Sequence, residues 1–257
     1  MSEPKPHQKP IQCIGIILDG NRRWAKGKGL PTLEGHRRGF ENLKSAARWV
    51  RDRGIPHLVV YAFSTENWNR APEEVSYLIA LIKEGASKDA KNLAEEKIKL
   101  RFVGEKERFA PDVREVLENA ERESPPDASL TLWICLSYGG RTEIVAAARE
   151  IESSGEEMTE DAFTRHLWTA GMPDPDIIIR TGGHYRLSNF LMWQSAYSEL
   201  FFLKTLWPDF SEQELDDVLE EFAAPEDGLI LWIRTKPTTF PGEEAVIFGR
   251  IVETMKR

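Results

Sequence analysis

The sequence predicts an α/β fold: a single domain with a largely parallel, six-stranded sheet flanked by helices. Short apolar runs alternate along the chain with segments whose apolar residues recur every three or four positions, the spacing of one helical face. Most of the short runs are apolar throughout, which is typical of strands covered on both faces of a parallel sheet. Such strands are joined by right-handed crossover connections.

Each predicted strand ends where polar residues or glycines begin. The strands lie at about 12–18, 57–63, 98–103, 130–136, 176–179 and 199–203. The helices lie at about 36–53, 73–95, 111–122, 142–152, 159–168 and 211–222, and a short helix or turn is expected around 188–197. A glycine-rich loop at 20–35 leads into the first helix. Gly85, inside the second helix, permits a bend or the close approach of a bulky group, with core packing as the alternative explanation.

Three regions are distinguished along the 257 residues. Residues 1–11 are polar and proline-bearing, and we expect a disordered tail there. Residues 12–224 hold every predicted strand and form the domain. Residues 225–257 are broken by prolines and glycines around one apolar cluster, and we expect an extension that packs on the core or on a partner chain.

The composition excludes several classes of protein. A net charge of −8 argues against a general nucleic-acid binder, which usually has a basic surplus. No apolar run approaches the roughly 18 residues of a membrane span, and the N-terminus lacks the hydrophobic stretch of a signal peptide. Cys13 and Cys135 lie in apolar runs, where buried thiols in a reducing compartment explain them better than a disulfide. A cytoplasmic protein is therefore expected.

A cationic loop follows the first predicted strand. The apolar run stops at Asp19-Gly20-Asn21, and six cationic side chains follow in an otherwise acidic chain: Arg22, Arg23, Lys26, Lys28, Arg37 and Arg38. A carboxylate, a glycine and a cationic loop at a strand's end suit a metal-bound, multiply charged anion. A surface turn with solvated charges is the alternative.

A second cationic loop follows the fifth predicted strand. Arg180 and Arg186 flank a Gly-Gly pair, and Ser188 adds a hydroxyl group. Guanidinium groups match phosphate oxygens, so this loop is a candidate phosphate site, with two surface arginines as the alternative. Glu199 starts the sixth strand, where a carboxylate needs a partner: either an arginine or a divalent cation shared with Asp19.

Four loops that follow strands are expected to converge on one rim, because ligands of such sheets bind at the carboxyl ends of the strands. They are 19–21, 64–70, 137–141 and 180–188. His36 faces the first cationic loop or caps its helix, and the aromatic side chains of Trp24, Phe63 and Trp68 either wall an apolar cavity or pack in the core. Two anion sites, two carboxylates for Mg²⁺ and apolar helices behind them would fit a ligand with a charged head and an apolar body. No zinc-ligand spacing, nucleophile elbow, Walker loop or dinucleotide fingerprint supports a hydrolase, kinase or dehydrogenase.

Five motifs stand in one order along residues 13–224. They are Ile17–Trp24, Gly35-His36, Tyr61–Arg70, Tyr138–Arg141 and Ile179–Phe190, and a stretch from Tyr197 to Phe210 follows them. In this order they resemble the cis-prenyltransferases, or isoprenyl transferases, of the undecaprenyl diphosphate synthase type. The resemblance implies a parallel sheet with a hydrophobic tunnel, a homodimer and an Mg²⁺-dependent enzyme peripheral to the membrane. Such an enzyme adds isopentenyl diphosphate in cis configuration to an allylic diphosphate, usually farnesyl diphosphate, and makes a long polyprenyl diphosphate, often the lipid carrier of cell-wall synthesis.

The resemblance also implies roles for single residues. Asp19 would bind Mg²⁺, joined by Glu199 from the dimer partner or from nearby. The other roles fall into three groups: Gly20, Asn21, Arg22, Arg23, Trp24 and His36 around the allylic diphosphate; Ser64, Thr65, Glu66, Asn67, Trp68 and Arg70 at the reacting isoprenyl groups; Arg180, Arg186 and Ser188 on isopentenyl diphosphate. Asp19, Asn21 and Asn67 are the candidate catalytic residues, and Asn21 is near the point where a proton leaves the new chain. The helix at 73–95 and the strand at 130–136 would line the tunnel.

Three features depart from the family pattern. Thr32 lies where an arginine for the allylic diphosphate is usual, and Arg37 or Arg38 is the candidate substitute. His184 lies where a glutamate usually follows Arg-Thr-Gly-Gly, and a few relatives that make irregular or cyclised short products share this histidine. The tail 225–257 replaces an arginine-rich Arg-Phe-Gly segment, so the dimer contact is expected to differ. The alternatives are a short-chain or irregular synthase on the same scaffold, and a non-catalytic partner subunit, against which the intact Asp-Gly-Asn site argues.

Overall fold

The computed structural model describes residues 10–223, so most of the tail at 1–11 and the whole extension at 225–257 lie outside the described residues. The chain divides into two units, Pro10–Glu214 and a second unit of which only residues 215–223 are described. The strands are β1 (Cys13–Ile17), β2 (His57–Ser64), β3 (Ile98–Val103), β4 (Leu130–Tyr138), β5 (Ile177–Arg180) and β6 (Glu199–Phe202). The helices are α1 (Asn21–Gly27), α2 (Thr32–Asp52), α3 (Pro72–Glu84), α4 (Ala90–Glu95), α5 (Pro111–Arg122), α6 (Gly140–Ser154), α7 (Glu160–His166) and α8 (Glu212–Ala223).

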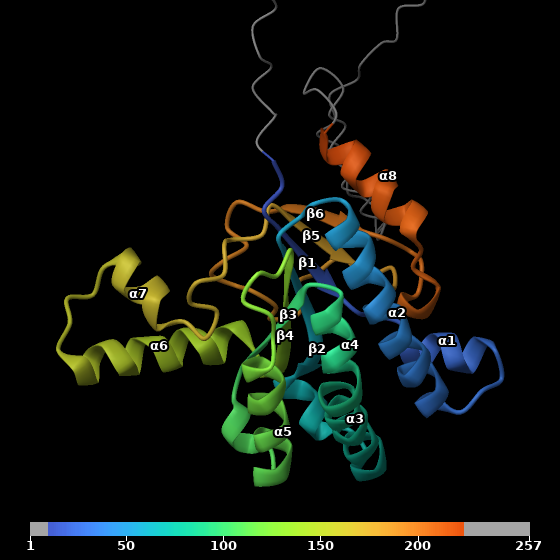
Figure 1. Cartoon of the computed structure of the whole chain (residues 1–257), viewed down its shortest axis with the longest axis horizontal. Helices are drawn as coiled ribbons and strands as arrows, with labels where there is room; N and C mark the ends of the chain where they lie inside the picture. Colours follow the sequence, from blue (N-terminus) through green and yellow to red (C-terminus); the bar gives the residue numbers. More distant parts are fainter. Residues whose placement is uncertain (1–9, 224–257) are drawn as a thin grey trace, which may run out of the picture. The chain divides into compact units, whose positions relative to one another are not determined.

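The six strands form one sheet in the order β3-β4-β2-β1-β5-β6, and every pairing is parallel. The predicted fold class is therefore confirmed. β1 lies between β2 and β5, with Ile17 opposite both Tyr61 and Arg180. All residues of β1 are buried, as expected for a strand covered on both faces. In Figure 1, α6 and α7 extend to one side of this sheet as a hairpin.

Two helical segments differ from their predictions. The loop expected at 20–35 contains α1, and α2 begins at Thr32 rather than near residue 36. The helix expected at 73–95 is α3, one π-helical turn at Gly85–Asp89, and α4. A Cβ atom on Gly85 would lie 2.3 Å from Cζ of Phe40, so this glycine does permit the close approach of a bulky ring. Of the short helix or turn expected around 188–197, the structure has turns.

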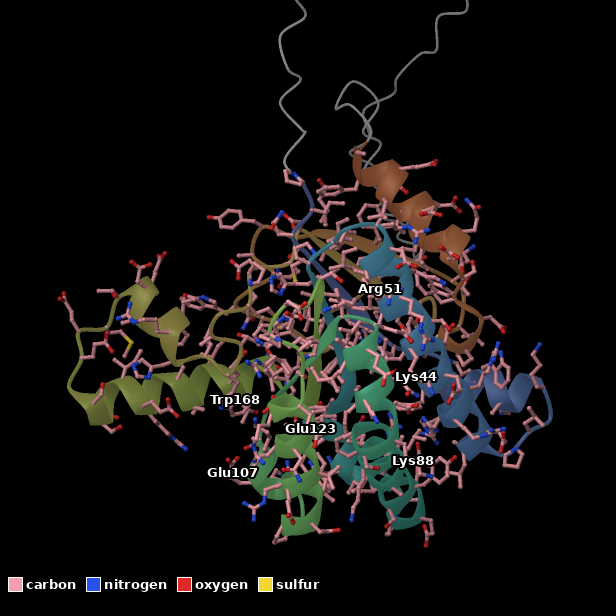
Figure 2. All side chains as sticks on the ribbon, viewed as in Figure 1. Lys44, Arg51, Lys88, Glu107, Glu123 and Trp168 are labelled. Carbon is pink, nitrogen blue, oxygen red and sulfur yellow. The ribbon has the colours of Figure 1, made fainter. Side chains whose placement is uncertain are left out.

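A row of ion pairs joins α2 to the segment after α3. Lys44 Nζ lies 3.3 Å from Asp89 Oδ1, and Arg48 Nε lies 2.7 Å from Glu96 Oε2. Arg51 Nη1 lies 3.1 Å from the same Glu96 oxygen. Figure 2 shows Lys44 and Arg51 along α2, next to α4. These pairs hold α2 against the segment from Asp89 to Glu96, and α2 also contributes residues to the cavity described below.

Two expectations from the composition can be compared with the structure. Cys13 and Cys135 are buried free thiols, as predicted, and burial raises the pKa of each. Across residues 10–223, no helix has both the length and the apolar character that a bilayer crossing requires.

Candidate active site

One cavity of about 930 Å³ lies at the carboxyl ends of the central strands. Its polar lining is contributed by the loops that were predicted to converge: Asp19, Asn21, Ser64, Glu66, Asn67, Arg70, Arg141, Arg180, Arg186 and Ser188. Because the strands are parallel, loops far apart in sequence meet along one edge of the sheet. The predicted convergence is confirmed.

Asp19, directly after β1, binds two guanidinium groups. Its Oδ2 accepts a hydrogen bond from Arg180 Nη2 at 2.9 Å, and its Oδ1 accepts one from Arg23 Nη2 at 3.1 Å. Arg180 is only 4% exposed, so its charge needs a partner inside the protein. The hydroxyl of Thr181 donates to the Asp19 carbonyl at 2.8 Å. One carboxylate therefore joins the two cationic loops.

Ser188 connects the two arginines of the second cationic loop. Its Oγ lies 2.6 Å from Arg180 Nη1 and 3.2 Å from Arg186 Nε, and it accepts from both. Ser188 and Asn189 have φ values of 51° and 68°, a left-handed turn that directs Asn189 toward the neighbouring loops. There the Asn189 side chain accepts from the Arg141 amide at 2.9 Å and donates to Glu66 at 3.3 Å. The Arg186 side chain is exposed and lines the cavity, so it can receive an anion.

The loop after β2 places its polar and aromatic side chains differently. Asn67 lines the cavity while its Oδ1 accepts from the Ser64 amide at 3.2 Å. Trp68 Nε1 donates to Ser137 Oγ at 2.9 Å, and its ring centroid lies 5.0 Å from that of Phe63. Neither ring lines the cavity, and neither does Trp24. Core packing is therefore correct for Phe63 and Trp68, and an aromatic cavity wall made by these three residues is wrong.

Glu74, in the first turn of α3, was missed by the sequence interpretation. Its Oε1 lies 3.0 Å from His36 Nε2, 2.8 Å from Arg70 Nη1 and 3.9 Å from Arg22 Nε. An acid in the first turn of a helix is common, so no sequence pattern singled it out. Desolvation lowers the pKa of His36, and the hydrogen bond that the His36 ring donates to Glu74 offsets part of that effect. Glu74 thus gathers three residues that were predicted to bind substrate.

We expect Glu74→Gln to move the pKa of His36 further below its ordinary value of 6.5, because an amide attracts the imidazolium less than a carboxylate does. A histidine with a folded pKa below its unfolded value destabilises the fold as pH falls through the unfolded value, since the unfolded chain binds the extra proton. As the pH decreases below 6.5, the unfolding free energy of the variant should therefore decrease more than that of the wild type. Histidine NMR titration gives the midpoints, and His166, whose pKa is raised by Glu156 and Glu150, serves as an internal reference. Glu73→Gln, next to it on the exposed side, is the matched control, and an unchanged His36 midpoint in Glu74→Gln would contradict the prediction.

Below the polar rim, α2 and α3 form an apolar wall. Phe40 and Leu43 of α2 and Leu78, Leu81 and Ile82 of α3 line the cavity there. The stretch of α3 from Glu74 to Ile82 corresponds to about 12 Å along the helix axis. Three residues of the helix that was predicted to line a tunnel, Leu78, Leu81 and Ile82, therefore line this cavity, and its role as the tunnel for a growing chain stays a prediction. The prediction for strand 130–136 is wrong, because none of its residues lines the cavity.

The cation donors differ from the predicted pair. Asp19 is a hard oxygen donor with a partly exposed side chain, which suits Mg²⁺, an ion that combines one or two carboxylates with substrate phosphates and water. Glu199 pairs with Ile177 at the amino end of the strands, whereas Asp19 follows the carboxyl end of β1. The two residues are therefore at least about 10 Å apart along the strand direction. The prediction that Glu199 joins Asp19 from nearby is wrong within one chain, and among residues 10–223 no group of three or more His, Cys, Asp or Glu side chains is arranged to hold a metal ion.

Some predicted binding residues lie beside the cavity without lining it. These are Gly20, Arg22, Arg23, Trp24, Thr65 and Trp68. Arg22 and Arg23 reach the site through Glu74 and Asp19. Thr32 begins α2, and neither Arg37, which pairs with Glu34 at 2.9 Å, nor Arg38 lines the cavity. That Arg37 or Arg38 replaces the arginine expected at position 32 stays a prediction.

Several known proteins are similar to this chain in sequence and in architecture. A family model described as "Putative undecaprenyl diphosphate synthase" matches residues 17–227. An isoprenyl transferase of Neisseria meningitidis is 43% identical over 210 residues, which are 81% of this chain and 85% of that protein. Lavandulyl diphosphate synthase from Lavandula x intermedia, solved with dimethylallyl diphosphate, superposes with a TM-score of 0.80 at 33% identity, covering 83% of this chain and 95% of that one. A probable undecaprenyl diphosphate synthase from Campylobacter jejuni superposes with a TM-score of 0.71 at 28% identity, covering 84% and 96%.

Proposed function

Because the chain belongs to the undecaprenyl diphosphate synthase family of isoprenyl transferases, we propose that it adds isopentenyl diphosphate units in cis configuration to an allylic diphosphate. The proposed primer is farnesyl diphosphate, and the proposed product is a long-chain polyprenyl diphosphate such as undecaprenyl diphosphate, a lipid carrier of cell-wall synthesis. One observation carries the proposal: a single cavity joins Asp19, Arg180 and Arg186 at its rim to Leu78 and Leu81 of α3. Its 930 Å³ is at the upper end of the roughly 300–1,000 Å³ of a small-molecule site, which supports binding of two substrates.

Two diphosphates need two sets of cationic groups. We assign Arg180, Arg186 and Ser188 to isopentenyl diphosphate, and the side of the cavity around Asn21, Arg23 and His36 to the allylic diphosphate. Asn21 Oδ1 is buried and accepts no hydrogen bond from residues 10–223, which leaves an acceptor free at the cavity. This acceptor supports a role for Asn21 near the proton that leaves the growing chain.

The condensation requires positive charge at the departing diphosphate. Bound Mg²⁺ supplies part of that charge as a Lewis acid. Arg23 and Arg180, which contact opposite oxygens of Asp19, supply the rest from fixed positions. Ser64, Glu66 and Asn67 line the cavity between the two anion sites, so we assign them to the reacting isoprenyl groups.

We further propose a cytoplasmic homodimer, peripheral to the membrane that takes up the product. β6 is an edge strand, and Glu199 is exposed at its start. Tyr197 and Leu200 beside it are 95% and 44% exposed, which supports a subunit interface there. Glu199 would then act in the partner's site. Sedimentation of the purified chain measures the oligomeric state.

The proposal is tested by incubating the purified protein with radiolabelled isopentenyl diphosphate, farnesyl diphosphate and Mg²⁺. We expect label in a polyprenyl diphosphate, resolved by chain length after dephosphorylation, and none when EDTA is present. A catalytically silent protein that binds both diphosphates would indicate the non-catalytic partner subunit instead.

A short-chain or irregular synthase is the second candidate, favoured by His184 and by the likeness to lavandulyl diphosphate synthase. That reaction class would join short allylic diphosphates to each other. Incubation with dimethylallyl diphosphate alone separates the two functions, because an elongating enzyme also needs isopentenyl diphosphate. A branched or cyclised ten-carbon product from this incubation would favour the second candidate.

Product length should respond to the side chains at the far end of the cavity. We expect Ile82→Trp to shorten the product, because the larger ring occupies space two turns below Glu74. Phe40→Ala should lengthen it, since this ring faces Gly85 at the same end. Ala80→Trp, on the exposed side of α3, is the control. Equal product distributions from the Ile82 and Ala80 variants would contradict this assignment.

A further inference from the structure

The backbone after β5 places His184 at a fixed position over Asp19. Gly182 and Gly183 have φ values of 89° and 71°, which favour glycine, and a Cβ atom on Gly182 would lie 2.5 Å from Arg23 Nη2. The Gly182 amide donates to the Thr205 carbonyl at 2.7 Å, and the Gly183 amide donates to the Leu203 carbonyl at 2.8 Å. Arg23 Nη1 donates to the Gly182 carbonyl at 2.6 Å. The residue that follows this anchored turn has little freedom of backbone position.

His184 and Asp19 present two metal-binding atoms to the same cavity. His184 Nε2 lies 4.0 Å from Asp19 Oδ2, and the two side chains are 41% and 26% exposed. Both residues line the cavity, together with Arg180 and Arg186 of the second cationic loop. The imidazole can therefore reach a bound ion and its water without displacing a core side chain.

The spacing suits two ligands of one ion. Bonds from divalent metals to nitrogen or oxygen ligands are about 2.0–2.2 Å, so two ligands of one ion are at most about 4.4 Å apart. Their separation in tetrahedral or octahedral geometry is about 3.0–3.5 Å, which a small rotation of the partly exposed imidazole provides. A carboxylate has about four lone-pair positions, so Asp19 can keep its bonds from Arg23 and Arg180 while it binds an ion.

We infer that His184 is, with Asp19, a direct ligand of the divalent cation, which makes this a mixed nitrogen and oxygen site that accepts Mg²⁺ but binds Mn²⁺ or Co²⁺ more tightly. Imidazole suits transition metals, whereas Mg²⁺ prefers oxygen ligands alone. The remaining positions would be filled by diphosphate oxygens and water. This inference rests on the proposed function, since it concerns the cation of the same diphosphate site.

Electron spin-echo envelope modulation tests the inference, because it detects nitrogen bound directly to Mn²⁺. The full chain is mixed with Mn²⁺ and inorganic pyrophosphate, and the wild type is compared with His184→Gln and His184→Glu. We expect imidazole nitrogen modulation in the wild type and its loss in both variants. The control His166→Gln alters a half-buried histidine on α7, outside the cavity, and should keep the modulation. Competition of Mg²⁺ against bound Mn²⁺ should show a Mn²⁺ preference that falls at least tenfold in His184→Glu.

Two results would overturn the inference: Mn²⁺ that does not bind the pyrophosphate-loaded wild type, or modulation that His184→Gln leaves unchanged. The proposed function is tested separately, by measuring whether the wild type condenses its substrates with Mg²⁺ or with Mn²⁺. If the wild type condenses isopentenyl diphosphate but shows no imidazole modulation, the proposed function is supported and His184 is not a metal ligand. Imidazole modulation in a wild type that does not condense the substrates would support His184 as a metal ligand and contradict the proposed function.

Discussion

Asp19→Asn is expected to lower the turnover of condensation by at least about 10³-fold while the fold survives. The amide keeps the volume of the side chain and still accepts a bond from Arg180, so the buried guanidinium retains three acceptors. It loses the negative charge that holds a divalent cation beside the departing diphosphate, and 10³-fold corresponds to about 4 kcal/mol of transition-state stabilisation. Steady-state rates with farnesyl and isopentenyl diphosphates measure the loss, and near-UV circular dichroism measures the fold.

Asp176→Asn is the matched control for this substitution. Asp176 Oδ2 accepts from the Gln12 and Cys13 amides at 2.7 and 3.0 Å, at the opposite end of β1. Its substitution removes the same charge from the same sheet far from the cavity, so it should change thermal stability but leave turnover within about twofold. Equal losses of turnover in the two variants would show that Asp19 acts through the fold rather than through the reaction.

Glu143→Leu is expected to destabilise the protein by about 3–5 kcal/mol. The Glu143 side chain is fully buried and accepts four hydrogen bonds from neutral groups. Its Oε2 lies 2.5 Å from the Tyr138 hydroxyl and 3.0 Å from Gln194 Nε2, and its Oε1 binds the Thr169 amide and hydroxyl. Leucine would leave these donors buried without an acceptor, at about 1–3 kcal/mol each before relaxation. Denaturant unfolding measures the difference.

The same carboxylate joins three segments around the site, namely the end of β4, the loop before β5 and the loop after Asn189. The folded fraction of Glu143→Leu should therefore bind isopentenyl diphosphate more weakly, because the loop that carries Arg186 and Ser188 would be less ordered. Glu150→Leu, an exposed position on the same helix, should cost less than about 1 kcal/mol. If Glu143→Leu and Glu150→Leu lowered the unfolding free energy by the same amount, the four hydrogen bonds of Glu143 would make no net contribution to stability.

The strands could be predicted closely because their pattern is local. A strand covered on both faces must be apolar at nearly every position, so β1 and β3 differ from their predicted ranges by at most a residue. α1 was missed because its glycine-rich surroundings favour a loop, while the structure packs it on α2. A Cβ atom on Gly35 of α2 would lie 2.1 Å from the Asn21 carbonyl oxygen, so the contact depends on a glycine fourteen positions beyond the start of α1.

The site was predictable as a set of loops and only partly as a set of contacts. Arg180 ends a strand, and Asp19 and Ser188 lie in loops after strands, where topology alone brings residues together. Glu74 and Glu143 derive their roles from partners that are distant in sequence, which no local pattern encodes. Glu199 was misplaced because a residue that starts a parallel strand and one that follows a strand lie at opposite edges of the sheet.

The position of β1 between β2 and β5 has a consequence for biosynthesis. Arg180 leaves the ribosome roughly 8–30 s after Ile17 at ordinary rates of elongation, so the nascent chain holds β1 with one open edge throughout that time. We predict that β1, β2, β3 and β4 assemble first and that β5 and β6 dock last. Pulsed hydrogen exchange during refolding should protect the amides of Val59 and Ile134 before those of Ile178 and Ile179, and simultaneous protection would refute this order. A nascent chain released before residue 177 would therefore carry Asp19 without Arg180, and would expose the edge of its central strand to other chains.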